Sequence, residues 1–124
     1  MKYILLAYTN VDAWADATPE EIQATGPDVY AEIGRELVER GEAVYNAGLG
    51  EPPHTRTLRK SGDQVVTTDG PYAELKEVLV SFGIIDVDSH DRAMEIAARF
   101  VNPDAEGEYV DVRPVIDSLD DLAG

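Results

Sequence analysis

The chain of 124 residues has the length of one domain, and we expect a single domain over residues 1–124. Its hydrophobic content of 44% is enough for a packed core, while 25 acidic against 10 basic residues give a net charge of −15. This charge repels phosphate backbones and anionic bilayers, so we expect neither nucleic acid nor a membrane as a partner.

Cysteine is absent, which excludes disulfides, thiolate metal sites and cysteine nucleophiles. The apolar run near the N-terminus is too short for a secretion signal, and no stretch of the sequence approaches the length of a transmembrane helix. We therefore expect a cytoplasmic protein.

The first part of the chain alternates strand and helix patterns. Residues 2–8 (KYILLAY) are apolar, β-branched or aromatic on both faces, which predicts a strand buried on two sides. A short helix is predicted to begin at Thr18 and to stop at Gly26. A second helix should run from about Asp28 to Gly41, because apolar residues recur at every fourth position: Val29, Ile33 and Leu37.

The second part is dominated by strand patterns. Residues 42–48 read as a strand, and residues 54–60 and 64–68 read as a hairpin joined through Ser61-Gly62-Asp63. The apolar run 78–87 predicts another strand, and residues 109–115 predict a last strand at a sheet edge, since Pro114 cannot donate a ladder hydrogen bond. Between these two strands, Asp88 or Ser89 should cap a helix with an apolar stripe of Ala93, Ala97 and Phe100.

This order of elements predicts an α+β fold, a ferredoxin-like sandwich with an added β-hairpin. Its two main helices can cover only one face of the sheet, whereas the strands at 2–8 and 78–87 are apolar on both faces. The second face needs a partner, and a second copy of the chain is the simplest one. We therefore expect a homodimer.

Several stretches together resemble one known family. They are VTTDGPYAELKE, IIDVDSHDRAMEIAARF and VDVRPV, supported by MKYILLAY, the nearby Trp14, and NAGLGEPP before the hairpin. In this order and spacing the chain resembles the YCII-related superfamily, in its subgroup named for a DGPF motif, over nearly its whole length. The resemblance implies a dimeric α/β barrel, in which two ferredoxin-like subunits join sheet to sheet.

The resemblance implies a range of functions. Relatives include a lyase-like dehydrochlorinase that acts on a chlorinated aromatic, and many DGPF proteins occur near extracytoplasmic-function sigma factors. This chain departs from the family pattern at Tyr72, where Phe is usual, and at Leu75, where Thr is usual. The histidine proposed in some relatives to pair with an aspartate is absent from GPDVYAEIG, so that pair is not carried over.

The DGPY stretch has two interpretations that can hold together. As a turn, Asp69 bonds nearby backbone N–H groups, Gly70 takes a positive φ and Pro71 fixes the next residue. As a site, the same loop lines a pocket, with Asp69 as acid or base and Tyr72 as wall or hydrogen-bond donor. The neighbouring charges (Glu74, Lys76 and Glu77) are expected to form a solvent-facing surface.

Other candidate site residues are a histidine and three aromatic residues. His54 follows two prolines at the start of the hairpin and can meet a ligand, although solvent exposure is an alternative. Tyr8, Trp14 and Tyr45 are expected on the same side of the barrel as Tyr72, as ligand contacts or as core and interface residues. No metal-ligand spacing or phosphate-binding loop is present, so we expect neither a metal nor another cofactor.

These features predict a protein that binds a small, aromatic or enol-like molecule in a pocket at the DGPY loop. One alternative is a cofactor-independent lyase or isomerase with Asp69, and with His54 as a further candidate, in acid/base roles. A second alternative is a non-catalytic regulatory partner in a sigma-factor-linked pathway.

Overall fold

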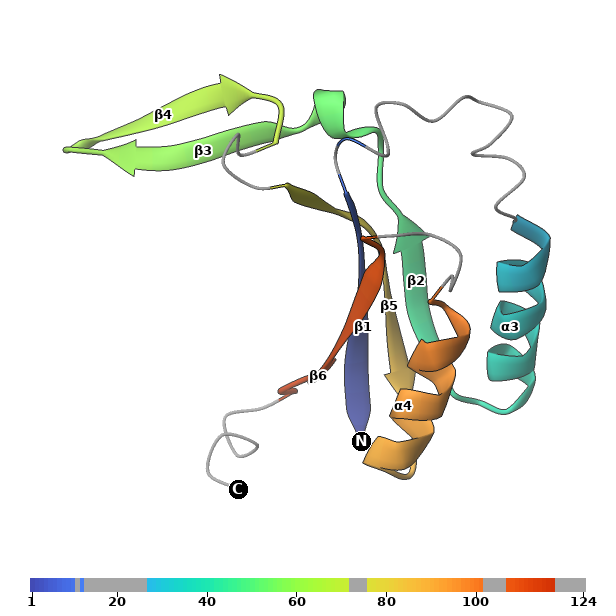
Figure 1. Ribbon diagram of the computed structural model, residues 1–124. Coiled ribbons are helices and arrows are strands. Elements are labelled where there is room, and N and C mark those ends of the chain that lie inside the picture. Colours follow the sequence, from blue (N-terminus) through green and yellow to red (C-terminus); the bar gives the residue numbers. More distant parts are fainter. Residues whose placement is uncertain (11, 13–26, 72–75, 102–106, 118–124) are drawn as a thin grey trace.

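The computed structural model describes residues 1–10, 12, 27–71, 76–101 and 107–117. These residues form an α+β fold, as the sequence predicts (Figure 1). The strands are β1 Lys2–Asn10, β2 Ala43–Gly48, β3 Arg56–Ser61, β4 Gln64–Asp69, β5 Glu77–Asp86 and β6 Tyr109–Pro114. The helices are α3 Pro27–Glu39 and α4 His90–Arg99, with a short 3₁₀ helix η1 at Pro52–His54. The helix predicted from Thr18 lies outside the described residues.

The ends of the two helices follow from local chemistry. Helix α3 ends at Glu39, two residues before Gly41, where the sequence predicts its end. Gly41 has φ +72°, a conformation that glycine adopts without steric cost. Ser89 caps α4, since its hydroxyl accepts a hydrogen bond of 3.1 Å from the backbone N–H of Arg92. Of the two candidate caps, Ser89 is therefore the residue that fills the role.

Four strands form one antiparallel sheet in the order β2-β5-β1-β6. With α3 after β1 and α4 after β5, this order is that of a ferredoxin-like fold. β6 lies at an edge of the sheet, as Pro114 predicts. β3 and β4 pair only with each other and form a hairpin that projects from one end of the sheet (Figure 1).

The hydrophobic core lies between the sheet and the two described helices. Tyr3, Leu5 and Ile85 of the sheet belong to one buried cluster with Ile33 and Leu37 of α3 and with three residues of α4, Ala93, Ile96 and Ala97. Phe100, half-buried, packs against this cluster, so the predicted stripe of α4 is confirmed with Ile96 added. Both helices therefore cover the same face of the sheet. The side chains of residues 27–30, Val29 among them, lie outside the described part.

The other face of the sheet carries apolar residues that the described helices do not cover. Side chains alternate along a strand, so the neighbours of buried Tyr3 and Leu5 point away from the core. Ile4 pairs with Ile84, and Leu6 pairs with Phe82. We call this surface the open face; its apolar residues include Ile4, Leu6, Tyr8, Tyr45, Ala47, Phe82, Ile84 and Tyr109, and Asp111 and Arg113 of β6 lie at its edge, opposite Leu6 and Ile4. Within the described helices, no segment is long and apolar enough to cross a membrane.

Candidate functional site

A cavity of about 490 Å³ lies where the hairpin joins the sheet. It is bounded by the far part of β1, the start of β5, η1 with the loop before it, and the base of the hairpin, which we define as residues 55–57 and 69–71. The lining residues are Tyr8, Leu49, Gly50, Glu51, Pro52, His54, Thr55, Thr57, Pro71, Glu77, Val78 and Leu79. Its volume is within the range of small-molecule sites, and most of its wall is apolar.

A break in strand pairing shapes the sheet side of this cavity. The register of β1 against β5 shifts between Ala7 and Tyr8, so that Tyr8 pairs with Leu79. Such bulges redirect side chains and are frequent beside functional sites. Beyond β2 the chain stays attached to β5, because the N–H of Leu49 donates to the carbonyl of Val80 at 2.9 Å. The loop that leads into η1 is thereby held over the start of β5.

The DGPY stretch includes a bend at Gly70 and Pro71. Gly70 has φ +87°, a conformation that is strained in residues with a Cβ. Its N–H donates to the carbonyl of Thr55 at 2.6 Å, and its carbonyl accepts a 3.0 Å hydrogen bond from the hydroxyl of Thr57. These two bonds fix the turn to β3, and Pro71, the next residue, lines the cavity.

Asp69 ends β4 at the base of the hairpin, with its side chain 82% exposed. Its carboxylate accepts a hydrogen bond of 2.5 Å from the guanidinium of Arg56, the residue opposite it in the hairpin. Asp69 is not among the lining residues of the cavity, although Pro71 is. A role for Asp69 as acid or base stays a prediction.

His54 and Tyr8 are the other two predicted site residues that line the cavity. His54 belongs to η1 and not to the hairpin strand, which begins two residues later at Arg56. The ring of Tyr8 stacks on that of Tyr109 of β6, with centroids 4.9 Å apart and planes inclined by 17°. This stack joins the cavity to the open face.

Tyr45 lies elsewhere on the open face, on edge strand β2. It is 60% exposed, and its ring centroid is 5.9 Å from that of Phe82. It does not line the cavity. Trp14 and Tyr72 lie outside the described residues.

Sequence reasoning missed much of the cavity wall. Leu79 and Thr57 belong to patterns that indicate strands, and nothing in those patterns separates a cavity wall from any other surface. Glu77 is exposed, as expected of a solvent-facing residue, and it also lines the cavity. The one usable signal was the NAGLGEPP stretch, whose Glu51 and Pro52 both contribute to the wall.

The electrostatic environment of the cavity and its surroundings is acidic. Glu51 and Glu77 line it, and Asp111 is in the strand that carries Tyr109. Desolvation, followed by the charges of Glu77 and Asp111, raises the pKa of the Tyr109 phenol. Among the described residues, no three His, Asp or Glu side chains are placed to hold a metal ion together.

Comparison with known proteins agrees with this fold. The model of the YCII-related domain matches residues 1–118, and the chain belongs to this family. A relative, an uncharacterized protein of Rhizobium meliloti (strain 1021), is 32% identical over 115 residues, which cover 93% of this chain and 92% of the relative.

Proposed function

We propose that this YCII-related protein binds a small organic molecule, aromatic or enol-like, in the cavity at the base of the hairpin. The observation that carries the proposal is the composition of the cavity wall. Apolar surface from Pro71 and Leu79 surrounds a few polar groups, those of Tyr8 and His54 among them. An apolar wall with a small number of polar groups is typical of sites that bury a ligand and fix its orientation.

The proposed unit of function is a homodimer that joins through the open face, as in a dimeric α/β barrel. Leu6 and Phe82 lie opposite each other on this face, in the two central strands of the sheet. An apolar surface of this kind is stabilised when a second copy covers it. Because Tyr8 belongs both to the cavity wall and to the open face, the partner would lie beside the site.

A second candidate function is acid/base catalysis without a cofactor, of the lyase or isomerase type. It is favoured by the position of His54, the one histidine among the described lining residues, because imidazole is the commonest general acid or base in enzymes. Asp69 is the further candidate, at the same hairpin base. The readout that separates the candidates is the fate of the ligand: an enzyme converts it, whereas a binding protein returns it unchanged.

The binding proposal is tested with a neutral aromatic probe, 2-phenylethanol, followed by amide NMR spectra of the protein. Amides of His54, Thr57 and Leu79 should shift in a saturable manner. Gly50→Phe should reduce these shifts, because Gly50 lines the cavity and no described atom beyond its chain neighbours lies within 4 Å of the place where a Cβ would be. Leu58→Phe, on the exposed surface of the hairpin, is the matched control and should leave them unchanged.

A further inference from the structure

The charges of the cavity wall indicate the class of ligand. Two glutamates belong to the wall: Glu51 lies in the loop before η1, and Glu77 is the first residue of β5. Among the described lining residues none is Lys or Arg, and the other members are apolar, hydroxyl-bearing or glycine, apart from His54. Two acidic side chains and no Lys or Arg give the described wall a negative charge.

The nearby aromatic pair strengthens this preference. Tyr8 lines the cavity and stacks on Tyr109, which is close enough to Glu77 and Asp111 for their charges to affect its phenol. The faces of tyrosine rings carry negative electrostatic potential and attract cations. The carboxylates and the tyrosine rings therefore both favour a positively charged ligand.

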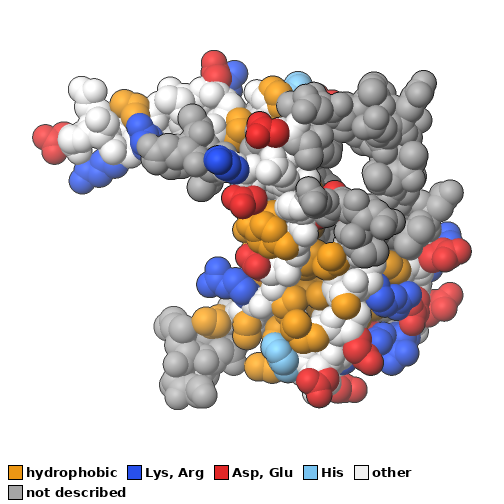
Figure 2. Space-filling view, in the orientation of Figure 1, with side chains coloured by type: hydrophobic (Ala, Val, Ile, Leu, Met, Phe, Trp, Pro, Cys, Tyr) orange, Lys and Arg blue, Asp and Glu red, His pale blue; other side chains and the backbone are white. Residues whose placement is uncertain are grey.

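Basic residues near the cavity, Lys76 and Arg56, are not among its described lining residues. Arg56, at the base of the hairpin, has its guanidinium paired with the carboxylate of Asp69. Figure 2 shows acidic side chains beside hydrophobic ones, with a basic side chain among them, where the hairpin meets the body of the molecule. The net charge of −15 adds a long-range field that attracts cations.

We propose that the cavity takes a small organic cation: an amine whose ammonium group lies near Glu51 and Glu77 and whose apolar body lies against Tyr8, Pro71 and Leu79. This inference rests on the proposed function, that the cavity binds a small molecule, and adds the charge of that molecule. Anions of the same size are disfavoured, because two carboxylates repel them and no described lining residue is a Lys or Arg that could pair with them.

Three probes with the same phenylethyl body and different charge test the proposal. They are 2-phenylethylamine, 2-phenylethanol and 3-phenylpropanoate, titrated at neutral pH and low salt, with amide NMR shifts as the readout. The amine should bind at least about 3-fold more tightly than the alcohol, and the carboxylate most weakly, since exposed carboxylates contribute modestly to such preferences. Added salt should reduce the difference.

Variants assign this preference to the cavity wall. Glu51→Gln combined with Glu77→Gln should bring amine and alcohol affinities together, while Glu39→Gln, at the C-terminal end of α3, should preserve the difference (Figure 1). Equal affinities of all three probes in the wild type, or an amine preference that survives in the double variant, would overturn the cation inference and leave the binding proposal intact. Absence of any saturable shift at cavity residues would overturn both.

Discussion

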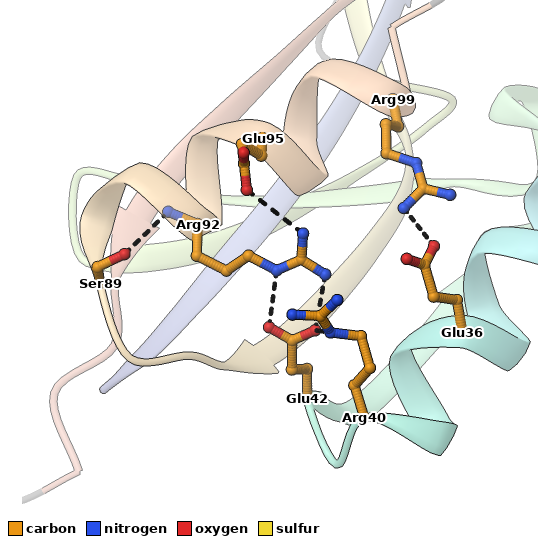
Figure 3. Close-up of polar contacts among 7 residues, drawn as sticks. All are labelled: Glu36, Arg40, Glu42, Ser89, Arg92, Glu95 and Arg99. Atoms are coloured by element: carbon orange, nitrogen blue, oxygen red, sulfur yellow. Dashed lines mark hydrogen bonds and ion pairs between the residues drawn. The ribbon is translucent and has the colours of Figure 1, made fainter.

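Arg92 of α4 binds the carboxylate of Glu42 through two hydrogen bonds, from Nε to Oε2 at 2.9 Å and from Nη2 to Oε1 at 2.8 Å (Figure 3). Glu42 lies just before β2, so the pair joins elements separated by 50 residues in the sequence. Arg40 approaches the same carboxylate, with its Nε 3.0 Å from Oε1. The side chain of Glu42 is only 11% exposed, and two guanidinium groups compensate its charge.

Glu42→Gln should lower the free energy of unfolding by about 1–2 kcal/mol at neutral pH, because the hydrogen bonds lose their ionic character. Hydrogen bonding to Arg92 lowers the pKa of the Glu42 carboxyl in the folded protein, although burial opposes this shift. The stabilisation is therefore fully present above the ordinary value of 4.5 and is lost as the pH falls through the lowered folded-state pKa.

Urea unfolding of the wild type and of Glu42→Gln between neutral and acidic pH measures this dependence. The difference between the two proteins should decrease in acid. Glu39→Gln serves as a control for the loss of one acidic charge at an exposed position of α3. A Glu42→Gln effect that stays constant into strongly acidic solution would contradict the assigned role of the ion pair.

Gly70→Val should destabilise the protein by about 1–2 kcal/mol, because valine resists the left-handed backbone conformation at this position. Among the described residues other than its two chain neighbours, no atom lies within 4 Å of the place where a Cβ would be, so the expected cost comes from the backbone. Gly48→Val is the control, at a strand glycine that also has open space and no positive φ. Thermal unfolding with equal midpoints for the two variants would show that the turn does not depend on Gly70.

Leu6→Asp should dissociate the proposed dimer or unfold the protein, because it places an unpaired charge on the open face. Sedimentation of the wild type should give a species of twice 13.5 kDa. Val38→Asp, at an exposed position of α3, should leave both the fold and the dimer unchanged. A dilute, folded wild-type protein that sediments as a 13.5 kDa species would show that the proposed dimer does not form.

Asp69→Asn should change the free energy of unfolding by less than about 0.5 kcal/mol, because the pair with Arg56 is exposed to solvent. Binding of the neutral probe 2-phenylethanol should also persist, since Asp69 does not line the cavity. Loss of that binding in a folded Asp69→Asn protein would place the carboxylate in the ligand site after all.

The elements of the fold were predictable because each depends on a local pattern. The recurrence of Ile33 and Leu37 marks one face of a helix, and the apolar run at 78–87 marks a central strand; both elements occur within a few residues of the predicted bounds. Caps such as Ser89 are equally local. Such patterns indicate which face of an element is buried, but they do not indicate which elements pack against each other.

The cavity depends on relationships of longer range, and only part of it was predictable. Residue type indicates Tyr8 and His54 as candidates and the DGPY motif indicates Pro71, and all three line the wall. That Tyr8 faces Leu79 follows from a register shift across 71 positions of sequence, which no local pattern contains. The pairing of Asp69 with Arg56 likewise depends on the hairpin register.

A crystal structure of the protein with 2-phenylethylamine shows directly whether the cavity at the base of the hairpin is a ligand site. We expect electron density for one molecule in this cavity, with the ring against Tyr8, Pro71 and Leu79 and the amine toward Glu51 and Glu77. At a concentration that saturates binding in solution, an empty cavity with the molecule elsewhere on the surface would contradict this expectation.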